Sequence, residues 1–273
     1  MFGSKIKKQI EKIEQQKKIY RCLLSRSQYR KELEDDLWER AGELASQFDL
    51  SSGDSSQTLQ KQNQKGLALA FQTIRQDSKQ SLDVSFIKDV HAQTMSFVSP
   101  TQGGLFRRGH ARWINSTMIV ANWVKIPYLM DNLMTGINQG RVPAFYWEER
   151  PNAQFQRLSH NPVIQAIEAN YNTIAIHPFS DGNKRTARLI STWILDRYGY
   201  IPLCVYDREA YITGIEDYYS TRHPGVWYMT MCDQMRKSYE NAIDEATRAE
   251  ICRVHMGNCC HRMLRAKALQ KLM

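Results

Sequence analysis

A polar segment of twelve residues, His177-Pro-Phe-Ser-Asp-Gly-Asn-Lys-Arg-Thr-Ala-Arg188, lies between two apolar stretches of the chain. Its histidine can act as a general base near neutral pH, and the carboxylate of Asp181 can hold a divalent cation. Gly182 and Asn183 tolerate unusual backbone angles, so successive N–H groups there can form an anion-binding nest. With two arginines on one helical face, the segment holds the groups needed for attack on a nucleotide phosphate.

The segment is positioned by two predicted helices. Asn161-Pro162 supplies an Asn N-cap and a proline at the first helical position. The helix that follows carries a buried stripe and ends near residue 176, and a second helix over residues 183–198 is stopped by Gly199. A single histidine at a helix end, or a single Gly-Asn pair, is usually structural. Eight specified residues within twelve positions make coincidence a poor explanation.

Further helices are predicted over most of the chain, which gives an all-α fold with one small hairpin. Residues 4–44 contain no proline and carry an apolar heptad-like stripe, so they are expected to form one amphipathic helix. A short hairpin is expected at 113–124, where β-branched and aromatic residues mix with turn formers. The other helices are expected at 66–75, 84–97, 128–139, 208–219 and from 226 onward, with a loop or helix entry at 50–64 and a loop at 98–112.

The composition is that of an ordinary folded protein. With 273 residues, 42% of them hydrophobic and 24% charged, the chain is long enough for one large domain or two small ones. No apolar run is long enough for a transmembrane helix, and the N-terminus lacks a signal-peptide core. Six cysteines without a small-domain disulfide pattern favour a reducing compartment.

The net charge of +9 is concentrated at the two ends of the chain. Residues 1–31 contain ten Lys and Arg against two Glu, and residues 248–273 contain six against one. Residues 32–247 have more acidic than basic residues. No nucleic-acid-binding motif accompanies the charge, so no specific nucleic-acid partner is expected. The basic ends are expected to contact a protein or an anionic membrane, or simply to pack on the body.

The segment HPFSDGNKRTAR at 177–188 resembles the signature of the Fic (Fido) family, His-Pro-Phe-x-[Asp/Glu]-Gly-Asn-Gly-Arg-x-x-Arg. Weaker similarities lie at GLFR (104–107), which resembles the loop before the target-binding flap of the family, at IPYLMDNLMTGIN (126–138) and at REAYITGIEDYY (208–219). The resemblance covers about residues 60–235. It implies a Fic catalytic domain at 60–235, an N-terminal helical basic arm at 1–59 and a basic helical tail at 236–273.

The resemblance implies an all-helical core with a β-hairpin flap and transfer of part of a nucleotide, most often AMP from ATP, onto a protein hydroxyl. By position, His177 would deprotonate the target Ser, Thr or Tyr, and Asp181 would bind Mg²⁺. Phe179 would anchor the motif in the core. The remaining implied roles are phosphate binding by Gly182, Asn183, Lys184, Arg185 and Arg188, and alignment of the target by the flap residues Trp113, Ile114, Val120, Ala121 and Asn122.

Lys184 departs from the signature because it stands where the family has its second glycine. The Doc branch of the family, which transfers the γ-phosphate as a protein kinase, also has Asn-Lys-Arg here. Doc-type motifs usually have Ala in place of Gly182 and lack a match to Arg188, so this chain is a hybrid. Gly182 and Arg188 favour nucleotidyl transfer, whereas Lys184 favours phosphoryl transfer, a reoriented nucleotide or a catalytically weak binding protein on the same fold.

A second departure concerns control of activity. Many family members carry an inhibitory helix with the motif [Ser/Thr]-x-x-x-Glu-[Gly/Asn], whose Glu pairs with the second motif arginine. Ala45-Ser-Gln-Phe-Asp-Leu50 resembles a degraded version in which Asp49 replaces the Glu. Asp is one methylene shorter, so a pair with Arg188 would be strained or absent. The alternative is that Asp49 is an ordinary exposed acid near a helix end.

Other features leave alternatives open. The tail holds Cys252, His255, Cys259, Cys260 and His261, which could bind Zn²⁺ but are more typical of helical core or partner-facing residues. The resemblance implies a target protein of unknown identity and leaves open a regulatory or antitoxin partner, the oligomeric state, and a role as toxin or effector. A cytoplasmic location and delivery into a host cell by a dedicated secretion system are both consistent with the sequence.

Overall fold

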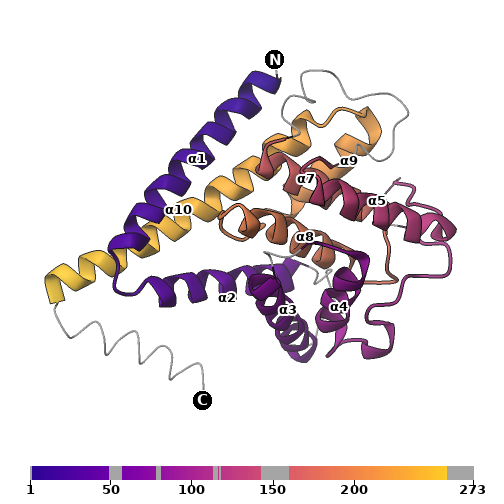
Figure 1. Cartoon of the computed structure of the whole chain (residues 1–273), viewed down its shortest axis with the longest axis horizontal. Helices are drawn as coiled ribbons and strands as arrows, with labels where there is room; N and C mark the ends of the chain where they lie inside the picture. Colours follow the sequence, from indigo (N-terminus) through magenta and orange to yellow (C-terminus); the bar gives the residue numbers. More distant parts are fainter. Residues whose placement is uncertain are drawn as a thin grey trace.

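The computed structural model describes residues 2–48, 57–77, 81–112, 116, 118–142 and 160–256 (Figure 1). Within these residues no strand is present, which confirms the all-α prediction, and one isolated antiparallel bridge joins Phe106 to Phe179. The elements are α1 (Phe2–Arg26), α2 (Arg30–Phe48), α3 (Gln57–Asp77), α4 (Val84–Met95), η1 (Pro100–Gln102), η2 (Trp123–Lys125), α5 (Ile126–Asn138), α7 (Pro162–Ile176), α8 (Asn183–Arg197), α9 (Arg208–Thr221) and α10 (Gly225–Met256).

Helices α7 and α8 lie at the centre of the molecule, surrounded by the other helices (Figure 1). Every residue of α7 from Val163 onward is buried. The predicted cap is confirmed, because the Asn161 side chain accepts a hydrogen bond of 2.9 Å from the Val163 N–H and Pro162 occupies the first turn. The predicted end of α8 is also confirmed, since Gly199 follows it with a φ of 68°. A helix buried on all sides makes a rigid base for the motif that follows it.

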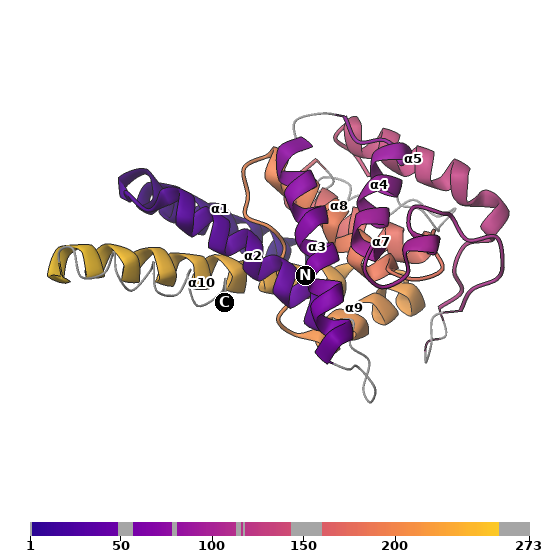
Figure 2. The same cartoon turned by 90° about the horizontal axis from the view of Figure 1, so that it is seen from below.

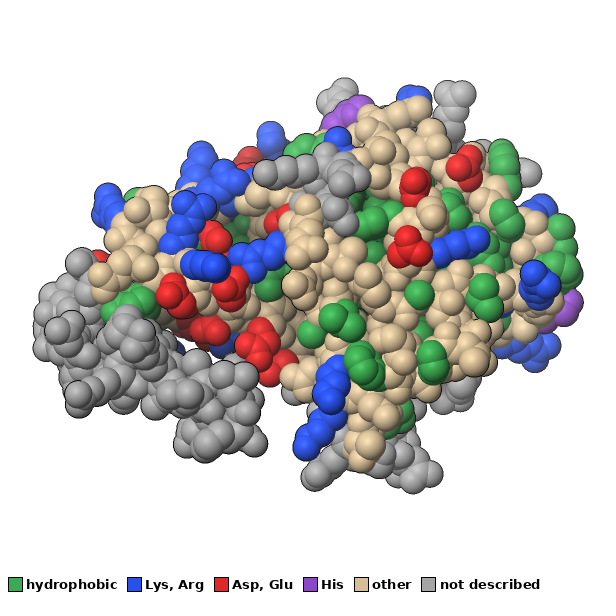
Figure 3. Space-filling model, turned by 60° about the horizontal axis from the view of Figure 1, so that its bottom comes forward, with side chains coloured by type: hydrophobic (Ala, Val, Ile, Leu, Met, Phe, Trp, Pro, Cys, Tyr) green, Lys and Arg blue, Asp and Glu red, His purple; other side chains and the backbone are tan. Residues whose placement is uncertain are grey.

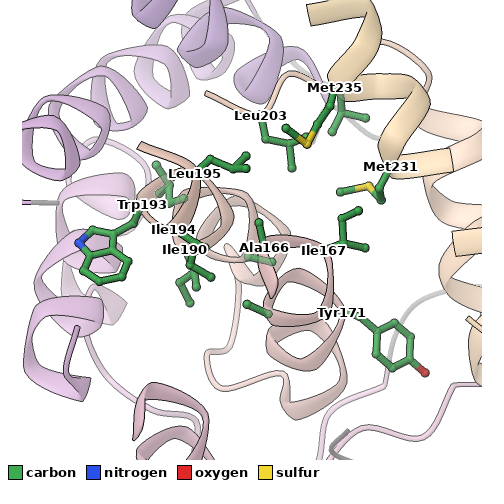
Figure 4. Packing of buried hydrophobic residues seen from close by; sticks show 14 of the residues in the cluster. Ala166, Ile167, Tyr171, Ile190, Trp193, Ile194, Leu195, Leu203, Met231 and Met235 are labelled. Atoms are coloured by element: carbon green, nitrogen blue, oxygen red, sulfur yellow. The ribbon is translucent and has the colours of Figure 1, made fainter. Parts of the chain in front are cut away.

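The core between these helices is aliphatic and aromatic (Figure 4). Ile167 of α7 lies beside Met231 of α10, and Leu203, from the segment after α8, lies beside Met235. Burial of each such side chain contributes about 1.5–3 kcal/mol relative to exposure. Because one buried cluster includes residues from α1 and α2 as well as from α10, the N-terminal helices are part of the same core.

Helix α1 lies along α10, and together with α2 they extend to one side of the body (Figures 1 and 2). The apolar stripe predicted for α1 is buried, and Tyr20 meets the ring of Tyr239 on α10 edge to face at 6.3 Å. Lys17, at the polar position of the stripe, donates to the Tyr198 carbonyl and lies 3.4 Å from the ring of Tyr200. The structure therefore matches the simpler of the two predictions for α1, a helix packed on the body.

The prediction of one helix over 4–44 is wrong, because the chain turns between α1 and α2. The Ser27 hydroxyl accepts a hydrogen bond of 3.1 Å from the Tyr29 N–H, which draws that N–H away from a helical partner. Tyr29 is buried at the turn. Local side-chain bonding of this kind does not interrupt a hydrophobic pattern, so periodicity alone could not show the break.

The arm formed by α1, α2 and α10 carries acidic as well as basic side chains, interspersed on the face seen in Figure 3. The guanidinium of Arg40 pairs with Glu245 of α10, and Arg75 of α3 pairs with Asp35 of α2 at 2.5 Å. The basic charge of this region is therefore partly neutralised within the fold.

None of the helices in the described ranges is long and apolar enough to cross a membrane. Helix α10 runs without a break from residue 225 to 256, and α3 begins at residue 57. The division of the chain at 59/60 and 235/236 stays a prediction. The tail cluster also stays untested, because Cys259, Cys260 and His261 lie outside the described residues.

A buried carboxyl sits where α7, α9 and α10 meet. Glu168 of α7 accepts hydrogen bonds from the hydroxyls of Tyr228 and, at 3.3 Å, Tyr218. Burial raises the pKa of Glu168 to about 7, and the two hydroxyls offset this in part. The folded protein therefore holds this proton more tightly than the unfolded chain does.

We expect Glu168 to lower the free energy of unfolding by about 2 kcal/mol as pH rises from 5 to 8, because its carboxyl must then lose its proton in a buried site. One pKa unit is worth about 1.4 kcal/mol. Glu168→Gln, which keeps an acceptor oxygen, should remove most of this loss. Thermal unfolding at both pH values measures it. The exposed Glu209→Gln is the matched control, and an unchanged pH dependence in Glu168→Gln would contradict the prediction.

Candidate active site

The motif begins where α7 ends. His177 caps the helix in the left-handed conformation, with φ 52° and ψ 59°, and its N–H donates to the Thr173 carbonyl at 3.0 Å. A non-glycine residue in this region costs on the order of 1 kcal/mol, so the surrounding structure must hold it there.

Arg107 provides that support. Its side chain is buried, and its Nε donates to the His177 carbonyl at 2.6 Å. The two terminal nitrogens donate to the carbonyls of Gly109 at 2.6 Å and Ala121 at 2.5 Å. One guanidinium thus ties the loop at Gly109 and the stretch at Ala121 to the end of α7. Its position in GLFR was part of the family resemblance, but this clamping role was not predicted, because it depends on carbonyls 14 and 70 residues away.

The loop after His177 is closed by side chains of the motif itself. Both ends of the Asn183 side-chain amide bond the backbone of Phe179. The Asn183 oxygen accepts from the Phe179 N–H at 2.9 Å, and the Asn183 nitrogen donates to the Phe179 carbonyl at 2.8 Å. Phe179 is fully buried, as expected of a core anchor. Gly182 adopts a φ of 75°, and a Cβ there would lie 3.0 Å from His91 Nε2 and 3.1 Å from Met95 Sδ. Glycine is therefore required at this position by conformation and by space.

Helix α8 starts immediately after Gly182. The Thr186 N–H bonds the Gly182 carbonyl at 2.9 Å and begins the hydrogen bonding of the helix. The N–H groups of the preceding first turn have no acceptor within an α-helix, and they carry the positive end of its dipole. A helix N-terminus of this kind can bind phosphate groups. Lys184, which is half-buried, lies on it.

The two motif arginines are buried and point to different elements. Arg185 contacts Asp181 Oδ2 at 3.2 Å and Asn63 Oδ1 of α3 at 2.5 Å. Arg188 is 1% exposed and donates to the Ala45 carbonyl of α2 at 2.9 Å. The segment expected to hold an inhibitory acid therefore does reach Arg188 in space. Asp49 itself lies outside the described residues.

His177 is neutral at physiological pH. Its pKa is lowered to about 4, first by burial and then by the positive charges of Arg107 and Lys184, while the Ile174 carbonyl and Asp181 act in the opposite direction. Its Nδ1 is buried without a hydrogen-bond partner among the described residues. A neutral imidazole at this position can accept a proton.

Asp181 fits a role in holding Mg²⁺. Its side chain is 62% exposed beside the start of α8, although one oxygen contacts Arg185 and the other accepts from the Gly182 N–H at 2.5 Å. No group of three or more potential metal ligands occurs in the described part of the chain. Mg²⁺ bound with a nucleotide needs one or two carboxylates in addition to phosphate oxygens, so a single Asp is sufficient.

The predicted hairpin at 113–124 is not shown. Trp113 and Ile114 lie outside the described residues, and 118–122 form no strand. Val120 is buried, while Asn122 is exposed and its side-chain oxygen accepts from the Val124 N–H. The Ala121 N–H donates to the Ala175 carbonyl at 3.1 Å and its carbonyl accepts from Arg107. This stretch therefore bonds the end of α7 instead of a partner strand.

Two hollows of about 440 and 430 Å³ lie away from the motif. The first is lined by α2, α10 and Tyr206, and the second by α1, α2 and the segment after α8, and neither includes a residue of 177–188. We place the candidate site at the motif, because a histidine, a carboxylate and a helix N-terminus lie together there and Arg185 contacts the carboxylate.

The chain is similar to known proteins over the region that holds the motif. Residues 81–195 match the Fic/DOC family model. Curated relatives named protein adenylyltransferase Fic are 31% identical over 143 residues in Drosophila willistoni and 31% over 119 residues in Aedes aegypti. The aligned regions cover 51% and 44% of this chain but only 25% and 20% of the relatives, so the chain spans about a quarter of the length of the relatives it matches.

Solved structures share the fold. A Fic domain containing signaling protein from Bacteroides thetaiotaomicron aligns with a TM-score of 0.68 at 18% identity, covering 86% of this chain and 98% of that one. Fic-1 from C. elegans aligns with a TM-score of 0.65 at 17% identity, covering 90% and 74%. IbpAFic2 covalently tethered to Cdc42 aligns with a TM-score of 0.51 at 14% identity, covering 73% and 63%.

We expect Arg107→Lys to destabilise the fold by about 2 kcal/mol, because a single ammonium cannot reach all the carbonyls that the guanidinium serves and leaves buried acceptors unsatisfied. Denaturant unfolding measures the change. Arg108→Lys, at the exposed neighbouring position, should be neutral. Equal stability of the two variants would show that the clamp contributes nothing.

Proposed function

Since residues 81–195 match the Fic/DOC family model, we propose that the chain transfers AMP from ATP to a hydroxyl of a target protein. The observation that carries the proposal is the neutral His177, held by Arg107 next to the N-terminus of α8. The names of the curated relatives support the same activity.

In the proposed reaction the target hydroxyl oxygen attacks the α-phosphorus of ATP. His177 accepts the hydroxyl proton, the new O–P bond forms, and the bond between the α-phosphorus and the bridging oxygen breaks to release pyrophosphate. The first turn of α8 and Arg185 stabilise the charge on the phosphates. Asp181 would hold Mg²⁺, which supplies charge neutralisation at the phosphate oxygens when it is bound.

Lys184 supports a second candidate reaction, transfer of the γ-phosphate. It lies on the first turn of α8, where the signature has glycine, and its charge contributes to the lowered pKa of His177. A side chain here changes how closely a phosphate chain approaches the backbone. If ATP bound to the same site in the opposite direction, its γ-phosphorus would face the target hydroxyl.

Control of the site is proposed to lie in α2. Arg188 is assigned to the distal phosphates, yet it is buried and bonds the Ala45 carbonyl near the end of α2. Displacement of this end of α2 would release the Arg188 guanidinium, which could then bind the phosphates of a nucleotide. Asp49, which follows α2, is the candidate inhibitory acid in this proposal.

The proposed partner is a target protein, whose residue and identity the sequence does not name. The neighbour structure with IbpAFic2 tethered to Cdc42 supports a protein as the acceptor. The flap residues Trp113, Ile114, Val120, Ala121 and Asn122 stay proposed for its alignment, although Ala121 already uses both backbone groups. Function in the cytoplasm or inside a host cell after secretion, and a partner for the basic arms, stay proposals.

We expect the added protein to increase labelling from ATP labelled on the α-phosphate but not from ATP labelled on the γ-phosphate, relative to the same lysate without it, because AMP transfer retains only the α-phosphorus. His177→Ala should reduce labelling by at least about a hundredfold. Lys184→Gly should raise α-label transfer about tenfold. Electrophoresis of a lysate with added protein measures both labels.

Label from the γ-phosphate alone would favour the kinase reaction. Absence of both labels, with function in cells unaffected by His177→Ala, would favour a binding protein on the Fic fold.

The lowered pKa of His177 predicts the pH profile of the transfer. Its basic form is already present above about pH 5, so kcat/KM should stay level from pH 8 to 5 and fall as pH approaches 4. Measuring the affinity for ATP at each pH separates the effect of ATP protonation on binding from the titration of His177. A midpoint near 6.5, the value of an unperturbed histidine, would contradict the burial argument.

A further inference from the structure

His91 of α4 lies against the motif loop, although the sequence pattern placed it only on a helix. It is 1% exposed, and its ring stacks on Phe179 with centroids 3.6 Å apart and planes 6° from parallel. Its Nε2 lies 3.0 Å from the Asp181 carbonyl, and its Nδ1 lies 2.9 Å from the Gly104 N–H. A single side chain thus bridges the loop before Arg107 and the loop before α8.

The Gly104 N–H fixes the tautomer of the ring. Because an N–H can only donate, Nδ1 accepts, and Nε2 must carry the proton that it donates to the Asp181 carbonyl. Burial keeps the ring neutral by lowering its pKa to about 4. Both ring nitrogens are therefore engaged by backbone groups from segments far apart in the sequence.

The carbonyl that His91 holds belongs to the peptide between Asp181 and Gly182. A peptide unit is planar, so fixing its carbonyl also fixes the direction of the Gly182 N–H on its other side. That N–H donates to Asp181 Oδ1 at 2.5 Å. Rotation of this peptide would change the orientation of Asp181 and of the first turn of α8 together.

We propose that His91 is a positioning residue for the phosphate site, which holds the 181–182 peptide so that the first turn of α8 faces the nucleotide. The use of the site for a nucleotide rests on the proposed function, whereas the positioning of the loop does not. If His91 only stacked on Phe179, it would be an ordinary core residue. The test must therefore remove its two hydrogen bonds while keeping the stacking.

Two variants separate hydrogen bonding from packing. His91→Phe keeps a flat ring on Phe179 but removes both hydrogen bonds. His91→Gln keeps an amide that can donate to the Asp181 carbonyl, and it also serves if the Phe variant fails to fold. Thr94→Val is the matched control, because Thr94 is equally buried on α4 and its hydroxyl bonds only the Val90 carbonyl of the same helix.

Hydrogen exchange of a peptide covering residues 178–186, measured without nucleotide, tests the positioning role. We expect exchange at least about tenfold faster in His91→Phe, a smaller increase in His91→Gln, and rates within about twofold of the wild type in Thr94→Val. A peptide covering α5 should be unchanged in all three. Exchange in His91→Phe within about twofold of the wild type would overturn the proposal.

Calorimetric titration with ATP and Mg²⁺ tests the link to the nucleotide. His91→Phe should weaken ATP binding at least about tenfold, with partial recovery in His91→Gln. Equal affinity in wild type and His91→Phe would overturn the assignment to the phosphate site. If the wild type binds no ATP, the proposed function fails, while the exchange result still decides whether His91 positions the loop.

Discussion

The guanidinium of Arg107 is buried among backbone carbonyls that come from separate segments of the chain. By donating to the His177 carbonyl it holds that residue in a left-handed conformation, which turns the chain out of α7. The same group anchors the segment at Ala121 and the loop at Gly109. Loss of these bonds would release the end of α7 from both segments, while Asn183 would still hold the loop closed on Phe179.

Charge serves two purposes in this molecule, and only one of them concerns the site. The basic helix α1 is packed on α10, and Lys17 and Arg40 bond groups within the fold. The cationic groups of the motif lie at the start of α8, away from this arm. Part of the net charge therefore belongs to a helix that packs on the body, and the partner of the exposed basic side chains stays a proposal.

The sequence was sufficient for features that depend on neighbouring residues. The cap at Asn161, the glycine that ends α8 and the motif between the two central helices were all predicted from local chemistry. The break at Ser27 was missed because a side-chain hydrogen bond leaves the apolar period intact. The hairpin at 113–124 was predicted from composition, but the described part of this stretch bonds α7 through Ala121 instead.

The residues that position the site were beyond reach of local patterns. Arg107 and His91 act on backbone groups up to 90 residues away, and their side-chain types alone do not reveal such contacts. A weak motif did point to the segment 45–50 as a neighbour of Arg188, and the structure shows Arg188 bonded to the Ala45 carbonyl, while Asp49 itself stays untested.

Calorimetric titration of ATP into the wild type, His177→Ala and Arg185→Gln tests the central claim most directly. If the first turn of α8 and the motif arginines bind phosphates while His177 only moves a proton, His177→Ala should bind ATP as tightly as the wild type, and Arg185→Gln should bind at least about tenfold more weakly. Absence of ATP binding to the wild type, or equal affinity in all three proteins, would contradict the account.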